Sequence, residues 1–172
     1  MSIKSLQDLI VNELRDMYHA ENQLVKALPK MVEAASTPAL KEAFGRHLKQ
    51  TENQVNRIET IFDQLGGDPK GKRCKGMEGI ISEGAEVLDE EAPGSVIDAA
   101  LIAAAQRVEH YEIAAYGCIR SHANLLGLGD VARLVEESLE EEEAADQQLS
   151  ELAETEVNTM ALEGAERNER QG

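Results

Sequence analysis

Two glutamates on the apolar side of a long helical segment constrain the fold of this chain most strongly. The segment at residues 106–119 reads QRVEHYEIAAYGCI, with apolar residues at helical spacing. At about 100° per residue, Glu109 and Glu112 fall roughly 60° apart, on the same face as Leu101 and Tyr116. A carboxylate that leaves water without a partner costs several kcal/mol, so it is usually neutralised, paired or bound to a metal. The rest of the chain therefore has to supply partners for these two acids.

The composition favours a bundle of helices. The chain has 172 residues, enough to bury a core in one domain. Hydrophobic residues make up 42% of it, but aromatic residues only 3%, and tryptophan is absent. A core of Ala, Leu, Ile, Val and Met is typical of helical bundles rather than β-sandwiches. We therefore expect an all-α protein.

The net charge and the cysteine pattern limit the cellular compartment and the binding partners of the protein. A net charge of −16 argues against nucleic acid and anionic membrane as partners, because both reward basic surfaces. There is no run of about 18 apolar residues for a transmembrane helix, and the N-terminus lacks the apolar region of a signal peptide. Cys74 and Cys118 lie far apart and form no CxxC pair, which excludes a rubredoxin-type iron site. A disulfide between them stays open, but the pattern fits a reduced cytoplasm.

Apolar periodicity predicts four long helices and a short one. The long helices span about residues 3–35, 38–65, 95–124 and 130–158, and the short helix spans about 77–91. Two long hairpins are thus joined by a connection that contains the short helix. That is the layout of a four-helix bundle with one crossover.

The ends of these helices carry their own signals. Thr37 is a candidate N-cap with Pro38 in the first helical position, and Ser95 and Asp130 are candidate N-caps of the last two long helices. Pro29, inside the first helix, is expected to bend it or to cost it a hydrogen bond. Residues 1–160 are expected to form one bundle domain, and residues 161–172 a polar, frayed tail.

Three of the long helices place an acid at the centre of the apolar stripe. Glu21 does so in the first helix, Glu109 and Glu112 in the third, and Glu142 in the fourth, where Asp146 lies about 40° from Glu142. These residues lie at similar depths along their helices, so they would meet at one level of an up-and-down bundle. Acids at one level in a low-dielectric core repel each other strongly unless they are protonated or neutralised by cations.

The second long helix contributes neutral polar residues to the same region. His47, Thr51 and Gln54 lie within its apolar stripe. A lone buried histidine is more often hydrogen-bonded than a metal ligand, and an amide is a poor ligand, so Gln54 is open to either role. Tyr116 is expected to pack near the acids, and Tyr18 could hydrogen-bond one of them. These neutral residues would then surround the ligands.

Bound divalent cations would neutralise these buried acids. A pair of iron or manganese ions is usual in such bundles, and zinc is an alternative. The predicted metal-binding residues are Glu21, Gln54, Glu109, Glu112, Glu142 and Asp146, with Tyr18, His47, Thr51 and Tyr116 around them. In the competing interpretation, the acids are protonated or bridged by water, or they hold one structural ion.

Five segments of the chain resemble the YciF/YciE family of bacterial ferritin-like proteins. They read YHAENQLVKALPK, HLKQTENQVNRIE, KGMEGIISEGAEVL, AALIAAAQRVEHYEIAAYG and LEEEEAADQQLSELA, and the likeness extends to about residue 160. The resemblance implies a ferritin-like bundle related to rubrerythrin, an intracellular stress-associated setting, a homodimer and a di-iron centre. The chain departs from the ferritin-like Glu-x-x-His pattern, since Glu142 is followed by Asp146 and the second helix has no such pair.

The leading hypothesis for function is an iron-binding stress-response protein with oxidase or peroxidase chemistry. Catalytic residues are not assigned, and electrons would have to come from an unidentified donor protein, because the chain has no CxxC pair. The alternative is a non-catalytic structural or interaction bundle that keeps a vestigial or single-metal site. A storage cage is a third option, and a dimer would exclude it.

Overall fold

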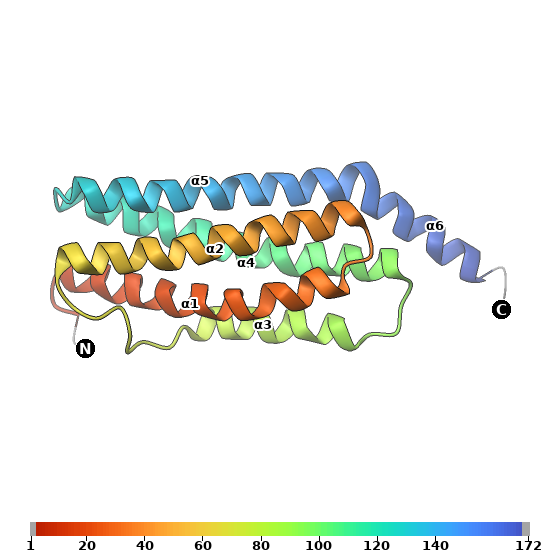
Figure 1. Cartoon of the computed structure of the whole chain (residues 1–172), viewed down its shortest axis with the longest axis horizontal. Helices are drawn as coiled ribbons and strands as arrows, with labels where there is room; N and C mark the ends of the chain where they lie inside the picture. The colour runs from red at the N-terminus through yellow and green to blue at the C-terminus, as the bar shows by residue number, and fades with distance from the viewer. Residues whose placement is uncertain (1–2, 170–172) are drawn as a thin grey trace.

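Four long amphipathic helices lie side by side in the computed structural model, which describes residues 3–169 (Figure 1). They are α1 (Leu6–Ala34), α2 (Pro38–Leu65), α4 (Gly94–Leu125) and α5 (Gly129–Leu152). The connection from α2 to α4 carries α3 (Lys75–Glu86) and the 3₁₀ turn η1 (Val87–Asp89). The expected all-α, four-helix bundle with a helix in its crossover is confirmed.

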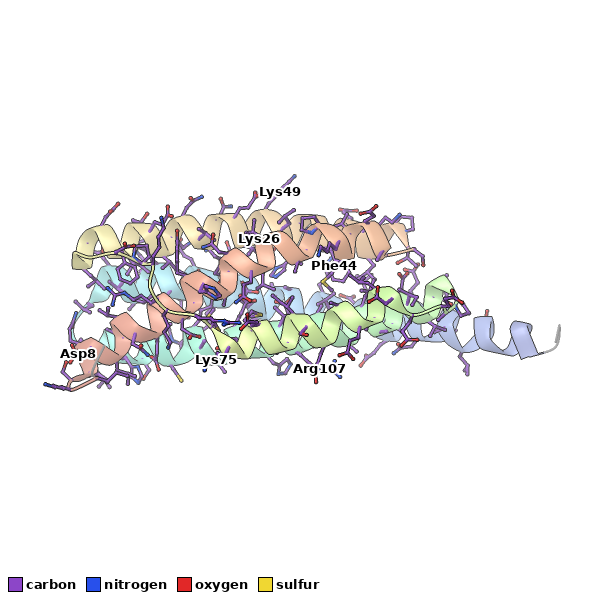
Figure 2. All side chains as sticks on the ribbon, turned by 90° about the horizontal axis from the view of Figure 1, so that it is seen from below. Asp8, Lys26, Phe44, Lys49, Lys75 and Arg107 are labelled. Carbon is purple, nitrogen blue, oxygen red and sulfur yellow. The ribbon has the colours of Figure 1, made fainter. Side chains whose placement is uncertain are left out.

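Each long helix packs against two others. The hairpins α1–α2 and α4–α5 face one another, with α2 against α5 and α1 against α4, and α3 lies along α1 and α4 (Figure 1). Apolar faces meet inside, and charged faces point outward: Lys49 projects from α2, while Phe44 of the same helix is buried (Figure 2). Within residues 3–169, no helix combines the length and the apolar character needed to cross a bilayer.

The helix starts agree only in part with the sequence signals. Thr37 occupies the N-cap of α2 and Pro38 the first helical position, although the Thr37 side chain makes no capping bond. Ser95 and Asp130 are not N-caps, because α4 and α5 begin one residue earlier, at Gly94 and Gly129. Both side chains lie in the first turn instead, where the negative charge of Asp130 still suits the helix dipole.

A fully buried acid that the sequence did not signal joins the two hairpins. Asp98 of α4 accepts hydrogen bonds from Ser36 N at 2.6 Å, Ser36 Oγ at 2.7 Å and Thr37 N at 2.9 Å. Three donors satisfy its carboxylate, as burial of such a group requires. Asp98 therefore fixes the turn between α1 and α2 against the first turns of α4.

The C-terminal part of the chain continues as a helix where a frayed tail was expected. After the π-helical turn η2 (Ala153–Val157), α6 (Asn158–Glu169) turns away from the axis of α5 and extends past the end of the bundle (Figure 1). It packs on α4: a Cβ on Gly164 would lie 3.0 Å from Ser95 Oγ. Residues 170–172 of the expected tail lie outside the described residues, and the domain boundary at residue 160 stays a prediction.

Candidate metal centre

Seven of the polar side chains that the four long helices bury are acids of the predicted site and their polar neighbours. They are Glu21 on α1, His47, Thr51 and Gln54 on α2, Glu109 and Glu112 on α4, and Glu142 on α5. Each position lies on the apolar stripe of an amphipathic helix, so folding carries it inward with its apolar neighbours. Neither glutamate of α4 could reach solvent without that helix turning its apolar face outward.

Four of these residues converge closely enough to bind one cation. Ligand atoms of His47, Glu109, Glu112 and Glu142 all lie within 4.8 Å of one another. His47 Nε2 lies 3.4 Å from Glu109 Oε1 and 3.7 Å from Glu142 Oε2. Neither ring nitrogen of His47 has a hydrogen-bond partner among the described residues, so both remain available to an ion.

The carboxylates of the cluster also hold unused oxygens. No nitrogen or hydroxyl donor of the described residues reaches either oxygen of Glu112, nor Oε2 of Glu109, Glu142 or Glu21. Buried polar atoms are rarely left in this state in a folded protein. An imidazole and several carboxylates form a donor set that suits a divalent ion such as iron, manganese or zinc. The residues present therefore fit a metal ion.

The electrostatics of the cluster support the same conclusion. Burial and, next, the charge of Glu142 raise the pKa of Glu21 to about 8, although the hydrogen bond from Tyr116 acts in the opposite direction. Burial and then the charge of neighbouring carboxylates also raise the pKa of Glu109 and of Glu112 well above the usual range. Without a cation these carboxyls hold protons near neutral pH, and a bound divalent ion would replace those protons.

The guanidinium of Arg57, at the edge of the core, is already paired. Arg57 donates to both oxygens of Glu141, at 2.7 and 2.8 Å, and to Ser138 Oγ at 3.0 Å. Glu141 thus occupies Arg57 at the edge of the core, while Glu142, the next residue, turns inward. Helical phase placed Glu142 at the centre of an apolar stripe, and its side chain is fully buried.

Gln54 and Tyr116 position two of the carboxylates. Gln54 Nε2 donates to Glu142 Oε1 and, at 3.0 Å, to Glu141 Oε2, and Tyr116 Oη donates to Glu21 Oε1. In Glu142 and Glu21, one oxygen accepts this hydrogen bond, and the other has no hydrogen-bond partner among the described residues. Gln54 thus orients Glu142 through its amide nitrogen, one of the two roles left open for it.

Three predicted site residues have other contacts. Tyr18 is corrected: its hydroxyl donates to Glu59 at 2.8 Å, on the outer side of the α1–α2 pair. Asp146 lies outside the four-residue cluster, with Oδ1 3.1 Å from His110 Nε2. Thr51 Oγ1 donates to the His47 carbonyl oxygen within α2 at 3.0 Å. His47, predicted to surround the ligands, is itself one of the four converging residues.

The fold and this cluster define a helical bundle with a candidate metal centre in its core. Residues 5–162 match the family described as Domain of unknown function (DUF892), and the chain belongs to this family. It is 43% identical over 162 residues to Protein YciF of Escherichia coli K12, covering 94% of this chain and 98% of that protein. The predicted membership of the YciF family is thereby confirmed.

Solved structures agree with this assignment. The E. coli stress protein YciF superimposes with a TM-score of 0.87 over 91% of this chain and 99% of that one. YcfI of Rhodopseudomonas palustris, for which a structural role has been suggested, is 42% identical with a TM-score of 0.84, covering 87% of this chain and 95% of that one. A protein of Xanthomonas campestris pv. campestris, 19% identical with a TM-score of 0.74 over 96% of this chain and 99% of that one, shares the fold.

Proposed function

We propose that this protein is a stress-response protein that binds a redox-active metal centre, consisting of two iron ions, inside its helical bundle. The proposal rests on four buried residues that converge, His47, Glu109, Glu112 and Glu142. Each of them has at least one nitrogen or oxygen atom without a hydrogen-bond partner among the described residues. Glu21, beside them, supplies a further carboxylate oxygen for the second ion. The likeness to the stress protein YciF supports the setting.

The side chains of the bundle would prepare such a centre in three ways. Gln54 and Tyr116 hold Glu142 and Glu21 in place. Complete burial of Glu21, Glu112 and Glu142 excludes bulk water and raises the energetic gain of binding a cation. The carboxyls release their protons on metal loading and accept them again on metal loss.

The reaction class proposed is oxidation by dioxygen or peroxide. Two bound irons would supply one electron each to such an oxidant, and carboxylate ligands tolerate both iron charge states. The electrons for a further turnover would come from a separate donor protein, since Cys74 and Cys118 are free thiols far apart in the sequence. We place the protein in the cytoplasm as a homodimer.

A second candidate is a structural or interaction protein with a single or vestigial metal site. The suggested structural role of the relative YcfI favours it. So does the ligand set, because Gln54 stands at a core position where a charged ligand would serve a second ion better. In this case a cation would join the helices without turnover.

Anaerobic loading with Fe(II), followed by dioxygen or hydrogen peroxide, separates the two candidates. The proposal predicts two irons per chain and an oxidation much faster than that of free Fe(II), both lost in Glu142→Gln. Tight metal binding without accelerated oxidation would establish the structural candidate instead. Absence of stoichiometric binding in the wild-type protein would refute the iron centre and leave only a structural bundle with a vestigial site.

A further inference from the structure

A narrow cavity between α2 and α5 reaches two residues of the buried acid cluster, His47 and Glu109. Its volume is about 10 Å³, of the order needed for one water molecule. Half of its lining residues are polar and half are apolar: the polar ones are His47, Gln50, Glu109 and Gln148, and the apolar ones are Ala43, Phe44, Ala145 and Leu149. Two of these residues, His47 and Glu109, belong to the four that converge in the core. The cavity therefore connects the candidate metal centre with the seam between two helices.

The two ends of this cavity differ in burial and in the chemistry of their side chains. At the inner end, His47 is 5% and Glu109 2% exposed, and both carry polar atoms without hydrogen-bond partners among the described residues. At the outer end, the amide side chains of Gln50 and Gln148 are half-buried, one on each helix. The outer end thus offers neutral amide oxygens as metal ligands, and the inner end offers an imidazole and a carboxylate.

We propose that divalent cations enter the bundle between α2 and α5, past Gln50 and Gln148, and are received first by His47 and Glu109. This inference rests on the proposed metal centre. A cation that passes a space of one-water size has to shed hydration water, which is costly unless other donors replace it. The amide oxygens, then the imidazole and the carboxylate, offer such donors in succession.

A larger cavity on the other side of the bundle is a poor route for an ion. It lies between α1, α3 and α4, has a volume of about 70 Å³ and is lined largely by apolar side chains, among them Leu24, Ala85 and Val108. It is larger, but its walls offer an ion almost nothing in exchange for water. The α2–α5 seam, although smaller, offers an ion more polar side chains than this cavity does.

Charge placed at the outer end of the seam tests the route. Stopped-flow mixing of the metal-free protein with Co(II), followed by the visible absorption of the bound ion, measures the loading rate without any turnover. Gln148→Lys should slow loading and Gln148→Glu should speed it, each about fivefold at low salt, as expected for a unit charge about 8 Å from a divalent ion in water. Added salt should shrink both effects. Gln50→Lys should act like Gln148→Lys from the facing helix.

Matched variants exclude a general effect of charge or packing. Gln147, next to Gln148 on α5, is exposed and does not line the seam, so Gln147→Lys and Gln147→Glu should leave the rate within about twofold of wild type. Ala85→Leu, which fills the apolar cavity, should not slow loading.

The amount of Co(II) bound at saturation separates this inference from the proposed function. Equal stoichiometry in all variants, with rates that follow the charge at position 148 but not at 147, supports the route. Equal stoichiometry with the same response at both positions, or slowing by Ala85→Leu alone, overturns the route and leaves the metal centre standing. No Co(II) bound by the wild-type protein would overturn both.

Discussion

His47 Nε2 of α2 lies 3.4 Å from Glu109 Oε1 of α4, inside a core where both side chains are almost fully buried. This contact joins the two hairpins of the bundle at the level of the acid cluster. The separation is long for a hydrogen bond but suits two ligands that share an ion. Replacement of a single acid of the cluster should therefore stabilise the metal-free protein but weaken metal binding.

Replacement of Glu112 by methionine is expected to stabilise the metal-free protein while it removes metal binding. No nitrogen or hydroxyl donor among the described residues reaches the Glu112 carboxylate, and it is fully buried. An apolar side chain of similar size should raise the free energy of unfolding at pH 7.5 by about 1–3 kcal/mol. Urea unfolding in the presence of a chelator measures this. The exposed Glu143→Met should change it by less than about 0.5 kcal/mol, and a Glu112→Met protein less stable than wild type would contradict the account.

The stability of the metal-free protein should fall as the pH rises from about 4.5 to 8. The pKa of Glu21 is raised from 4.5 to about 8 in the folded state. In that pH window the unfolded chain has already released the proton that the folded chain still holds, so rising pH favours unfolding. Chemical unfolding at several pH values should show this slope, and Glu21→Gln should make it shallower. A slope unchanged by Glu21→Gln would remove Glu21 as its source.

Metal affinity should change with pH in the opposite direction. The carboxyls of Glu21, Glu109 and Glu112, whose pKa values are all raised, must lose protons before they bind an ion, so affinity should increase as the pH rises towards 8. Co(II) titrations at pH 6 and pH 8 measure the difference. Equal affinity at both values would show that the ion does not displace protons from these groups.

Asp98 is expected to matter for stability and not for metal. Asp98→Asn keeps the shape but turns an amide donor toward the donors of Ser36 and Thr37, which should cost about 2–4 kcal/mol of unfolding free energy. Thermal or urea unfolding measures the loss, with the exposed Asp89→Asn as control. Metal bound per folded chain should equal that of the wild type, and its loss would tie Asp98 to the site.

Helical phase was enough to predict much of this architecture from sequence. Glu21, Glu109, Glu112 and Glu142 were separated from the other acids by their place on apolar stripes, because a stripe decides which face turns inward. The run of acids at 140–143 shows the strength of this criterion: Glu142 is buried, while Glu140 and Glu143 are exposed.

Phase alone could not decide contacts between helices. It put Tyr18 and Asp146 near the cluster, but the Tyr18 hydroxyl donates to Glu59, and Asp146 is not among the four converging residues. Conversely, His47 is drawn in because acids of α4 and α5 face it, which no local pattern of α2 reveals. Asp98 was missed for the same reason, since its partners lie 61 and 62 residues away in the sequence.

The most direct test of the account is the metal content of the protein purified without chelators or a metal-affinity tag. Elemental analysis should find stoichiometric iron in the wild type and in the exposed-site control Glu143→Ala. It should find almost none in Glu112→Ala and Glu142→Ala, although circular dichroism shows all of them to be helical. The same metal content in all four proteins would contradict the claim that the buried cluster binds the ion.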